Sequence, residues 1–167
     1  MVDAGVRIGA EWDGLVKRIL GAAVELHTRL GPGFLESIYQ KGMLVELRLA
    51  GLHTASEVEV PVFHRGIQLG RQHLDLVVAS CAILELKAVT KLDPVHYSQL
   101  RSYMAASGLP VGILLNFAGP KVECRRVYSP ADRAKFLGLR ALRVSAPGHL
   151  APSDEPQVAA EMPVAGS

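Results

Sequence analysis

The sequence predicts an α/β fold with a mixed central β-sheet flanked by helices. Two segments with apolar residues at helical spacing, 11–30 and 34–50, come first. Three strand-like segments, a strong helix start at Asp93-Pro94 and two more strand-like segments follow them. Helices and strands that alternate along one chain of 167 residues are expected to pack around a shared sheet.

The first helix is predicted over residues 11–30, because Leu15, Ile19, Ala22 and Leu26 repeat at helical spacing. It ends before Gly-Pro-Gly at 31–33, which no helix runs through. The second helix is predicted over 34–50, with Gly51 as its C-terminal cap. Its expected apolar positions are Leu35, Ile38, Leu44, Leu47 and Leu49.

A hairpin is expected after the second helix. Val58, Val60 and Val62 alternate with Glu and Pro residues over 57–62, which is a strand pattern. Pro61 favours an edge strand, because proline has no N–H to donate to a neighbouring strand. A turn at 64–66 then leads into a returning strand that ends near residue 79.

The returning strand and the one after it carry charges among apolar residues. On the return we expect Leu74, Leu76 and Val78 on one face and Asp75 on the other. A third strand is predicted over 81–89 after a short turn. Four of its side chains share one face: Ile83, Glu85, Lys87 and Val89.

The later elements follow clear signals. Asp93 as N-cap and Pro94 at the first position begin a helix that Gly108 ends. One stripe of this helix carries His96, Gln99 and Tyr103. A strand buried on both faces is predicted over 111–117, an alternating strand over 121–128 and a short helix over 130–139.

The composition describes one ordinary domain, predicted over residues 1–143. From 144 to 167 the sequence is rich in Pro, Ala, Ser and Glu without periodicity, so a disordered tail is expected. No apolar run approaches the ~20 residues of a membrane span, and the N-terminus lacks a signal-peptide pattern. Two isolated cysteines favour a reducing, cytoplasmic location, and a net charge of +2 is too small to identify a nucleic-acid-binding protein.

Asp75, Glu85 and Lys87 are the candidate site. Neighbouring strands joined by a tight turn can bring the two carboxylates side by side, where like charges repel unless a cation lies between them. Mg²⁺ prefers oxygen ligands and binds through one or two carboxylates. Lys87 shares the face of Glu85 and could steer a water or stabilise charge on phosphorus. Gln99, early in the next helix, could orient the nucleophile or the lysine.

This set of residues suits phosphodiester hydrolysis. Acyl transfer needs a nucleophile and a base, and no Ser-His-Asp or Cys-His arrangement suggests itself. The alternative is a surface ion pair between Glu85 and Lys87, with Asp75 a strand-edge charge. The segment around them is apolar on both faces, which favours a functional site, since a buried ion pair adds little stability. Glu36 taken alone is better explained as a first-turn carboxylate stabilised by the helix dipole than as a site residue.

An acidic residue on a helix, then Asp, then Glu-x-Lys on the next strand and Gln on the next helix resembles the PD-(D/E)XK nuclease superfamily. The segment GFLESIY at 33–39 matches the signature of one branch, the GxxExxY proteins, residue for residue. The resemblance covers residues 12–137 and implies a restriction-endonuclease-like core. The superfamily's Pro before Asp is absent, since Leu74 precedes Asp75.

The resemblance implies roles for five residues. Asp75 and Glu85 match the metal ligands, and Lys87 the catalytic lysine. Glu36 matches a helical acidic residue that helps to bind metal or water, and Gln99 a glutamine that orients the site. No role is implied for Tyr39, which packing of the helix on the sheet explains as well. His73 is left out of the ligand set, because a lone histidine in a strand is more often structural.

The leading hypothesis is therefore an enzyme, a Mg²⁺-dependent nuclease that hydrolyses DNA with a metal-activated water, with Mn²⁺ as a substitute. The alternative is a non-catalytic module on the same fold that binds nucleic acid or a protein partner. Hydrolysis of RNA or of a nucleotide is a third, weaker option. No membrane partner is expected, and a homodimer stays open because many nucleases of this fold act as dimers.

Overall fold

The computed structural model describes residues 12–129, which form three helices and one five-stranded sheet. The helices are α1 (Asp13–Leu30), α2 (Glu36–Leu49) and α3 (Pro94–Ser107). The strands are β1 (Thr54–His64), β2 (Ile67–Val78), β3 (Ala82–Lys87), β4 (Val111–Asn116) and β5 (Glu123–Tyr128). The predicted helix over 130–139 and the predicted tail over 144–167 lie outside the described residues.

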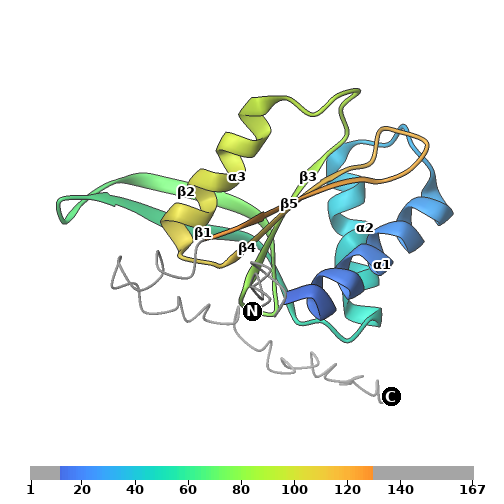
Figure 1. Ribbon diagram of the computed structural model, residues 1–167, viewed down its shortest axis with the longest axis horizontal. Coiled ribbons are helices and arrows are strands. Elements are labelled where there is room, and N and C mark those ends of the chain that lie inside the picture. Colours follow the sequence, from blue (N-terminus) through green and yellow to red (C-terminus); the bar gives the residue numbers. More distant parts are fainter. Residues whose placement is uncertain (1–11, 130–167) are drawn as a thin grey trace, which may run out of the picture.

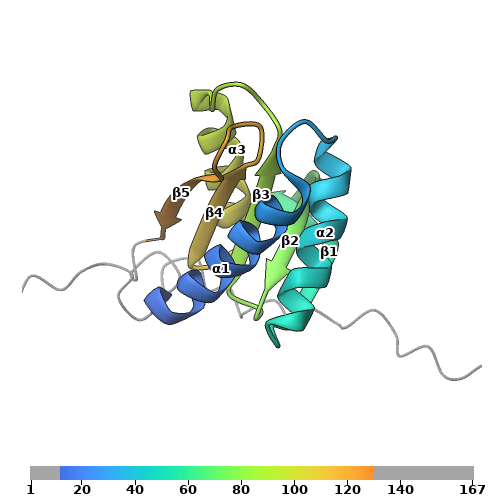
Figure 2. The ribbon, with the colours of Figure 1, turned by 90° about the vertical axis from the view of Figure 1, so that its right-hand side faces the viewer.

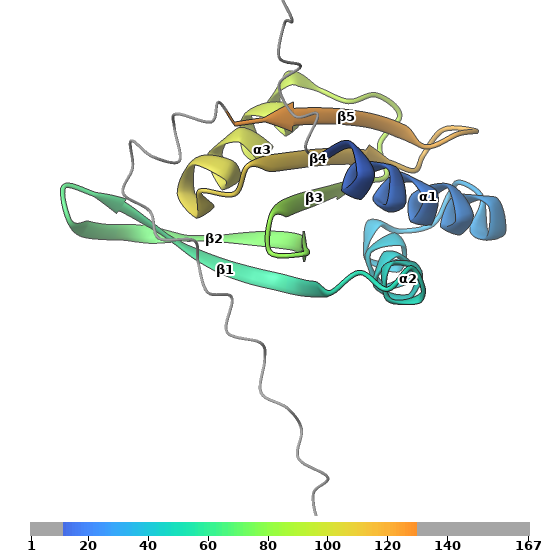
Figure 3. The same cartoon turned by 60° about the horizontal axis from the view of Figure 1, so that its bottom comes forward.

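The sheet is mixed, as predicted. Its strands follow the order β1-β2-β3-β4-β5, with β3 and β4 parallel and every other neighbouring pair antiparallel. Figure 3 shows this order from β5 at the top to β1 below. The parallel strands β3 and β4 are connected through α3. Strand β3 lies at the centre of the sheet, and every residue of β4 is buried, as expected for a strand covered on both faces.

The fold has three layers, and each face of the sheet has its own apolar cluster. Helices α1 and α2 cover one face and α3 covers the other (Figures 1 and 2). Side chains of β3 alternate between the clusters, with Leu84 and Leu86 toward α1 and α2 and Ile83 toward α3. Within residues 12–129, no helix is long and apolar enough to cross a membrane.

The packed face of α2 agrees only in part with the predicted one. Its buried residues are Tyr39, Met43 and Leu47, spaced four apart, so Leu47 is buried as predicted, and Leu44 packs partly buried against the same cluster. The prediction was wrong for Leu35, Ile38 and Leu49, which are exposed. Tyr39 and Met43 take their place in the core, and a prediction that followed only leucine and isoleucine did not include them.

The β1–β2 hairpin extends well beyond α3, and β1 is an edge strand as Pro61 predicts (Figures 1 and 3). The predicted alternation on β2 was wrong at one residue. Leu74 packs in the α3-side cluster, whereas Leu76 packs on the α1 and α2 side. At this point Glu57, on β1, has φ 52°, and neither Glu57 nor Asp75 belongs to a paired position of the β1–β2 ladder.

Candidate active site

The candidate site begins where β2 and β3 separate. The two strands are paired at Leu76 with Leu84 and at the next two positions toward the connecting turn. The pairing ends before Asp75 on β2 and Glu85 on β3. The Asp75 carboxylate accepts a hydrogen bond from the Leu86 N–H at 3.0 Å, where a strand carbonyl would otherwise pair. The side-chain amide of Gln40, on α2, donates to the Asp75 carbonyl at 3.4 Å. The strands therefore part at the two predicted carboxylates, and Asp75 is held at the opening.

Glu85 and Lys87 share one face of β3, as predicted. Glu85 is only 1% exposed, and its Oε1 accepts a hydrogen bond from Lys87 Nζ at 2.5 Å. Among the described residues, no group donates a hydrogen bond to the buried Glu85 Oε2. A buried carboxylate with one unpaired oxygen is costly unless another positive or donating group completes it.

Glu36 reaches the same group from the N-terminus of α2. Its Oε1 lies 3.8 Å from Lys87 Nζ, so Lys87 bridges the carboxylates of Glu36 and Glu85. A hydrogen bond from the Ala88 backbone also favours the charged form of Glu36. Glu36 is the first residue of α2, so the helix dipole stabilises its charge as well. This position is compatible with both explanations of Glu36, as a first-turn carboxylate stabilised by the helix dipole and as a residue of the site.

Tyr39 sets the path of the loop that precedes Glu36. Its hydroxyl donates to the Gly31 carbonyl at 2.8 Å and accepts from the Phe34 N–H at 3.3 Å. Its ring stacks on Phe117, with ring centres 4.6 Å apart. Gly33 has φ 102°, which non-glycine residues rarely adopt. Tyr39 thus fastens this loop to α2 and to the sheet, which is the packing role that the sequence left open.

Gln99 joins the site through a residue that the sequence analysis did not select. Its side-chain amide donates to the Tyr103 hydroxyl at 2.5 Å, one helical turn along α3. Burial raises the pKa of Tyr103, the hydrogen bond from Gln99 opposes this, and the charges of Glu85 and Asp75 raise it further. Tyr103 therefore lies within electrostatic reach of the carboxylates. In the sequence, the signal that could have identified Tyr103 was its position on the same stripe of α3 as Gln99.

His73 lies outside the site, in agreement with its omission from the predicted ligand set. Its side chain is 68% exposed, and its Nδ1 lies 3.9 Å from an oxygen of Glu59 on β1. Gln40 is the second residue that sequence reasoning missed. Its amide contacts a backbone carbonyl 35 residues away, and no local pattern signals such a contact.

Burial raises the pKa of each carboxylate in the group. For Glu85 burial and the neighbouring charge of Asp75 outweigh the hydrogen bond from Lys87 and raise the pKa to about 7. Burial likewise raises the pKa values of Asp75 and Glu36. Burial alone lowers the pKa of Lys87, but the hydrogen bond to Glu85 and the surrounding negative charges raise it above its ordinary value. The lysine is therefore a cation in a site with excess negative charge.

Two further observations concern the ligand set and the place of the site. Within residues 12–129, no three Asp, Glu, His or Cys side chains are grouped so that they could hold a metal ion, and the Lys87 ammonium lies between Glu36 and Glu85. The three-carboxylate ligand set of Glu36, Asp75 and Glu85 stays a prediction. The site lies beside the central strand β3.

Four of the five predicted residues nevertheless gather at the end of β3, and Gln99 approaches through Tyr103. A family model described as the PD-(D/E)XK nuclease superfamily matches residues 13–127. The chain belongs to the PD-(D/E)XK nuclease superfamily. The match spans every described element except one residue at the end of β5, so the restriction-endonuclease-like fold expected from the sequence is confirmed.

Solved structures resemble this superfamily member at low identity. The crystal structure of SSO0001 aligns with a TM-score of 0.47 and 16% identity, and covers 76% of this chain. The alignment spans 65% of the SSO0001 chain. An alkaline exonuclease from Laribacter hongkongensis (LHK-Exo) aligns with a TM-score of 0.39 and 13% identity, over 76% of this chain and 86% of that chain. Its complex with dAMP aligns with a TM-score of 0.40, 13% identity and the same coverage. A search of curated protein sequences found no match.

Proposed function

We propose that this chain is a Mg²⁺-dependent nuclease that hydrolyses phosphodiester bonds of DNA, with Mn²⁺ as a substitute. The observation that carries the proposal is Glu85. Its carboxylate is buried beside a second carboxylate, Asp75, and its Oε2 has no hydrogen-bond partner among the described residues. A cation bound there satisfies this oxygen and offsets the repulsion between the two acids.

The donor set fits a hard divalent cation. Asp75 and Glu85 offer carboxylate oxygens, and Mg²⁺ binds through one or two carboxylates while keeping several waters. We assign these two residues as metal ligands and Glu36 as a residue that holds Lys87 or a water near the metal. A bound Mg²⁺ lowers the pKa of a water and stabilises negative charge on the phosphate.

The remaining residues position and neutralise charge. Lys87 has three N–H donors, so it can bond Glu85 and a phosphate oxygen together, and its charge stabilises the transition state. Glu36 limits the movement of this ammonium through its contact at 3.8 Å. Gln99 donates to the Tyr103 hydroxyl, whose pKa burial and the charges of Glu85 and Asp75 raise, and we assign Gln99 the role of orienting this hydroxyl.

The narrower assignments belong to the same proposal. We place the chain among the GxxExxY proteins, because GFLESIY at 33–39 fits that signature and both Glu36 and Tyr39 have structural tasks. We expect one nuclease domain over residues 1–143 and a cytoplasmic location. DNA is favoured over RNA by the resemblance alone, and dimer formation stays a prediction.

Cleavage assays test the proposal. Supercoiled and linear DNA are incubated with Mg²⁺, with Mn²⁺ and with EDTA. We expect wild-type cleavage with either metal and none with EDTA. Asp75→Ala and Lys87→Ala should each lower the rate by about 10²-fold or more, because each removes charge stabilisation in the transition state. Glu59→Gln, an exposed acid on β1, should keep wild-type activity as the matched control. Retained cleavage in both site variants would overturn the assignment.

The rival function is a non-catalytic module on the same fold. The bridge that Lys87 makes between Glu36 and Glu85 supports it, because an ion pair can stabilise the acids without a metal. This reading predicts DNA or protein binding that persists in EDTA, with no nicking under Mg²⁺, Mn²⁺ or Ca²⁺. Circular dichroism of the wild type under the same conditions shows that the protein tested is folded.

A further inference from the structure

We propose that the pocket between the β1–β2 hairpin and α3 binds one base of the substrate strand, beside the scissile phosphate. The inference rests on the proposed nuclease function and names a base-binding subsite for it. The pocket has a volume of about 460 Å³ and lies on the α3 side of the sheet. Its walls are Pro61, Val62 and Phe63 of β1, Gln72 of β2, and three residues of α3.

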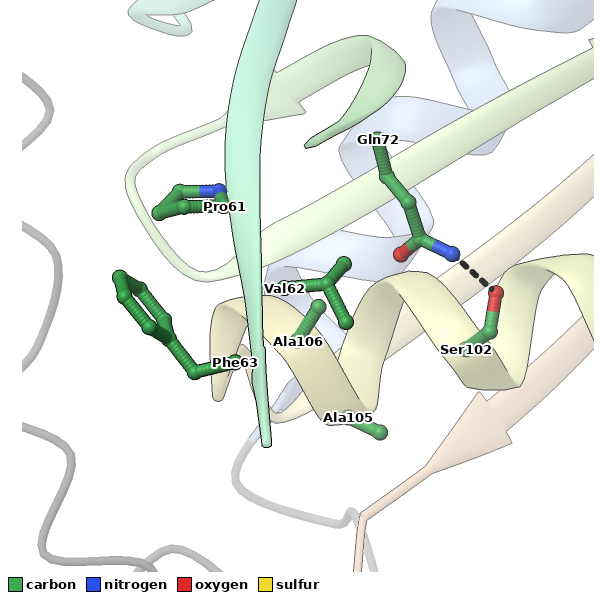
Figure 4. A pocket seen from close by; sticks show the side chains of 7 residues that line it. All are labelled: Pro61, Val62, Phe63, Gln72, Ser102, Ala105 and Ala106. Carbon is green, nitrogen blue, oxygen red and sulfur yellow. Dashed lines mark hydrogen bonds between the residues drawn. The ribbon is translucent and has the colours of Figure 1, made fainter. Parts of the chain in front are cut away.

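The pocket is mostly apolar and partly open to solvent. Ala105 and Ala106 form the helix side, and Val62 faces them from the hairpin (Figure 4). Small alanines leave the space that larger side chains would fill. Phe63 is 59% exposed, its ring lies on the other side of β1 from Val62 (Figure 4), and a register shift between Val62 and Phe63 redirects the chain there. The apolar slot between Val62 and the two alanines suits the flat apolar face of a base.

One polar group in the pocket requires a donor. Gln72 points from β2 toward α3 and donates through its Nε2 to the Ser102 hydroxyl at 2.9 Å (Figure 4). The Ser102 hydroxyl in turn donates to the Gln99 carbonyl at 2.7 Å, so it can only accept from Gln72. The amide is therefore oriented, and its Oε1 is a buried acceptor with no partner among the described residues. Because Gln72 lines the pocket, this acceptor belongs to the pocket wall, where an N–H of a ligand would satisfy it.

Two elements, β2 and α3, lead from the pocket to the candidate active site. Gln72 precedes Asp75 by three residues on β2, a separation of about 10 Å along a strand. On α3, Ser102 is bonded to Gln99 and is adjacent to Tyr103. A strand whose phosphate lies at Glu85 and Lys87 can therefore place a nearby base in the pocket. No acidic residue lines the pocket, and Arg101 is exposed on α3 next to Ser102, which suits a polyanion.

A base fits these groups better than an added protein strand does. Pro61 lacks an N–H, and the bulge at Val62 and Phe63 interrupts the edge of β1, so strand addition is disfavoured. A base supplies a flat apolar face for the slot between Val62 and the two alanines, and an N–H donor for Gln72 Oε1. Adenine and cytosine offer an exocyclic amine for this purpose.

The test measures binding of fluorescent single-stranded oligonucleotides by anisotropy in EDTA, so that no strand is cut. A single abasic site is moved along the oligonucleotide. For the wild type, one position should weaken binding about tenfold, the range found for loss of one stacked base. Ala105→Trp fills the pocket from an exposed position, and it should weaken binding of the intact strand by the same factor and abolish sensitivity to the abasic position. Ser98→Trp, also exposed on α3, is the matched control and should bind like the wild type.

A second comparison tests the contribution of the acceptor atom, Gln72 Oε1, to binding. At the sensitive position, adenine is replaced by purine, which lacks the exocyclic amine. The wild type should bind the purine strand several-fold more weakly, and Gln72→Met should bind both strands equally. Affinity that is independent of every abasic position and of Ala105→Trp overturns the subsite, and so does absence of any binding. An oligomer that Ala105→Trp dissociates, with DNA affinity unchanged, assigns the pocket to a second copy of the chain and overturns it too.

The experiments can disprove the base-binding subsite and the nuclease function independently of each other. Cleavage by the wild type with Mg²⁺ and no abasic sensitivity leaves the proposed function standing and removes the pocket. Abasic sensitivity without cleavage under any metal keeps the pocket as a base-binding site and removes the nuclease.

Discussion

Glu85 links the stability of the fold to pH. Its pKa is about 7 in the folded protein and near 4.5 for an ordinary glutamate, so the folded state binds more protons between these values. The free energy of unfolding therefore falls as pH rises through this window. The stabilising contribution of protonated Glu85 is complete below pH 4.5 and is lost as pH rises through about 7. The raised pKa values of Asp75 and Glu36 act in the same direction.

Urea unfolding in metal-free buffer tests this prediction. The wild-type free energy of unfolding should fall between pH 5 and pH 8, because Glu85 must ionise in a buried place. Glu85→Gln cannot ionise, so its free energy of unfolding should change less over the same range. Equal slopes for the two proteins would show that Glu85 does not titrate in this window.

A second prediction concerns a single atom, the hydroxyl oxygen of Tyr39. Tyr39→Phe removes the hydroxyl that holds the Gly31 carbonyl and the Phe34 N–H, and it keeps the ring that stacks on Phe117. Thermal and urea unfolding should show a loss of roughly 1–2 kcal/mol, the value of one or two net hydrogen bonds. Cleavage should also slow, since Glu36 follows this loop. Unchanged stability would mean that the loop holds its path without the hydroxyl.

The sequence defines α3 well because its signals are local. Asp93 caps the helix and forms a capping box with His96, and Gly108 ends it with φ 71°, as the sequence predicts. The buried face of α2 depends on what packs against it. Gly42 allows Leu26 of α1 to approach so closely that an added Cβ would lie 2.5 Å from the Leu26 Cδ1. Such a contact is not encoded in the spacing of the leucines.

Two leucines of α2 test the revised face directly. Leu47 is fully buried, whereas Leu49, two residues on, is 77% exposed. Leu47→Ala should lower the free energy of unfolding by about 2–5 kcal/mol, because it leaves a cavity. Leu49→Ala should change it by less than about 0.5 kcal/mol. Denaturant unfolding of the pair checks this, and similar losses would restore the face expected from the leucines.

The sequence predicts the part of the candidate site that depends on the two-residue period of a β-strand. Glu85 and Lys87 share a face because they are two apart on β3, and this alternation survives in the structure. Asp75 lies at an interruption of the ladder, where Glu57 across the hairpin is also unpaired and has a positive φ, and strand period does not predict this interruption. Glu36 was expected from the family resemblance, since nothing in local sequence brings a helix start to a strand end. Tyr103 and Gln40 needed tertiary contacts to be found.

Metal binding should stabilise the whole molecule in a pH-dependent way. A ligand at 100 times its Kd adds about 2.7 kcal/mol to the free energy of unfolding. At pH 8 the solution is above the Glu85 pKa of about 7, so this carboxylate is ionised and millimolar Mg²⁺ should raise the Tm by several degrees. At pH 5 protons compete for the carboxylates and the shift should be smaller. Differential scanning fluorimetry with Mg²⁺ or EDTA checks both values, and an equal shift at both pH values would point to a site elsewhere.

Isothermal titration calorimetry with Mn²⁺ or Mg²⁺ at pH 8 tests the central claim most directly. The wild type and the surface control Glu59→Gln should each show saturable binding, and the double variant Asp75→Asn with Glu85→Gln should show none. Circular dichroism of the double variant verifies that it is folded. Undiminished binding to the double variant, or no binding to the folded wild type, would contradict a metal-dependent site at the opening between β2 and β3.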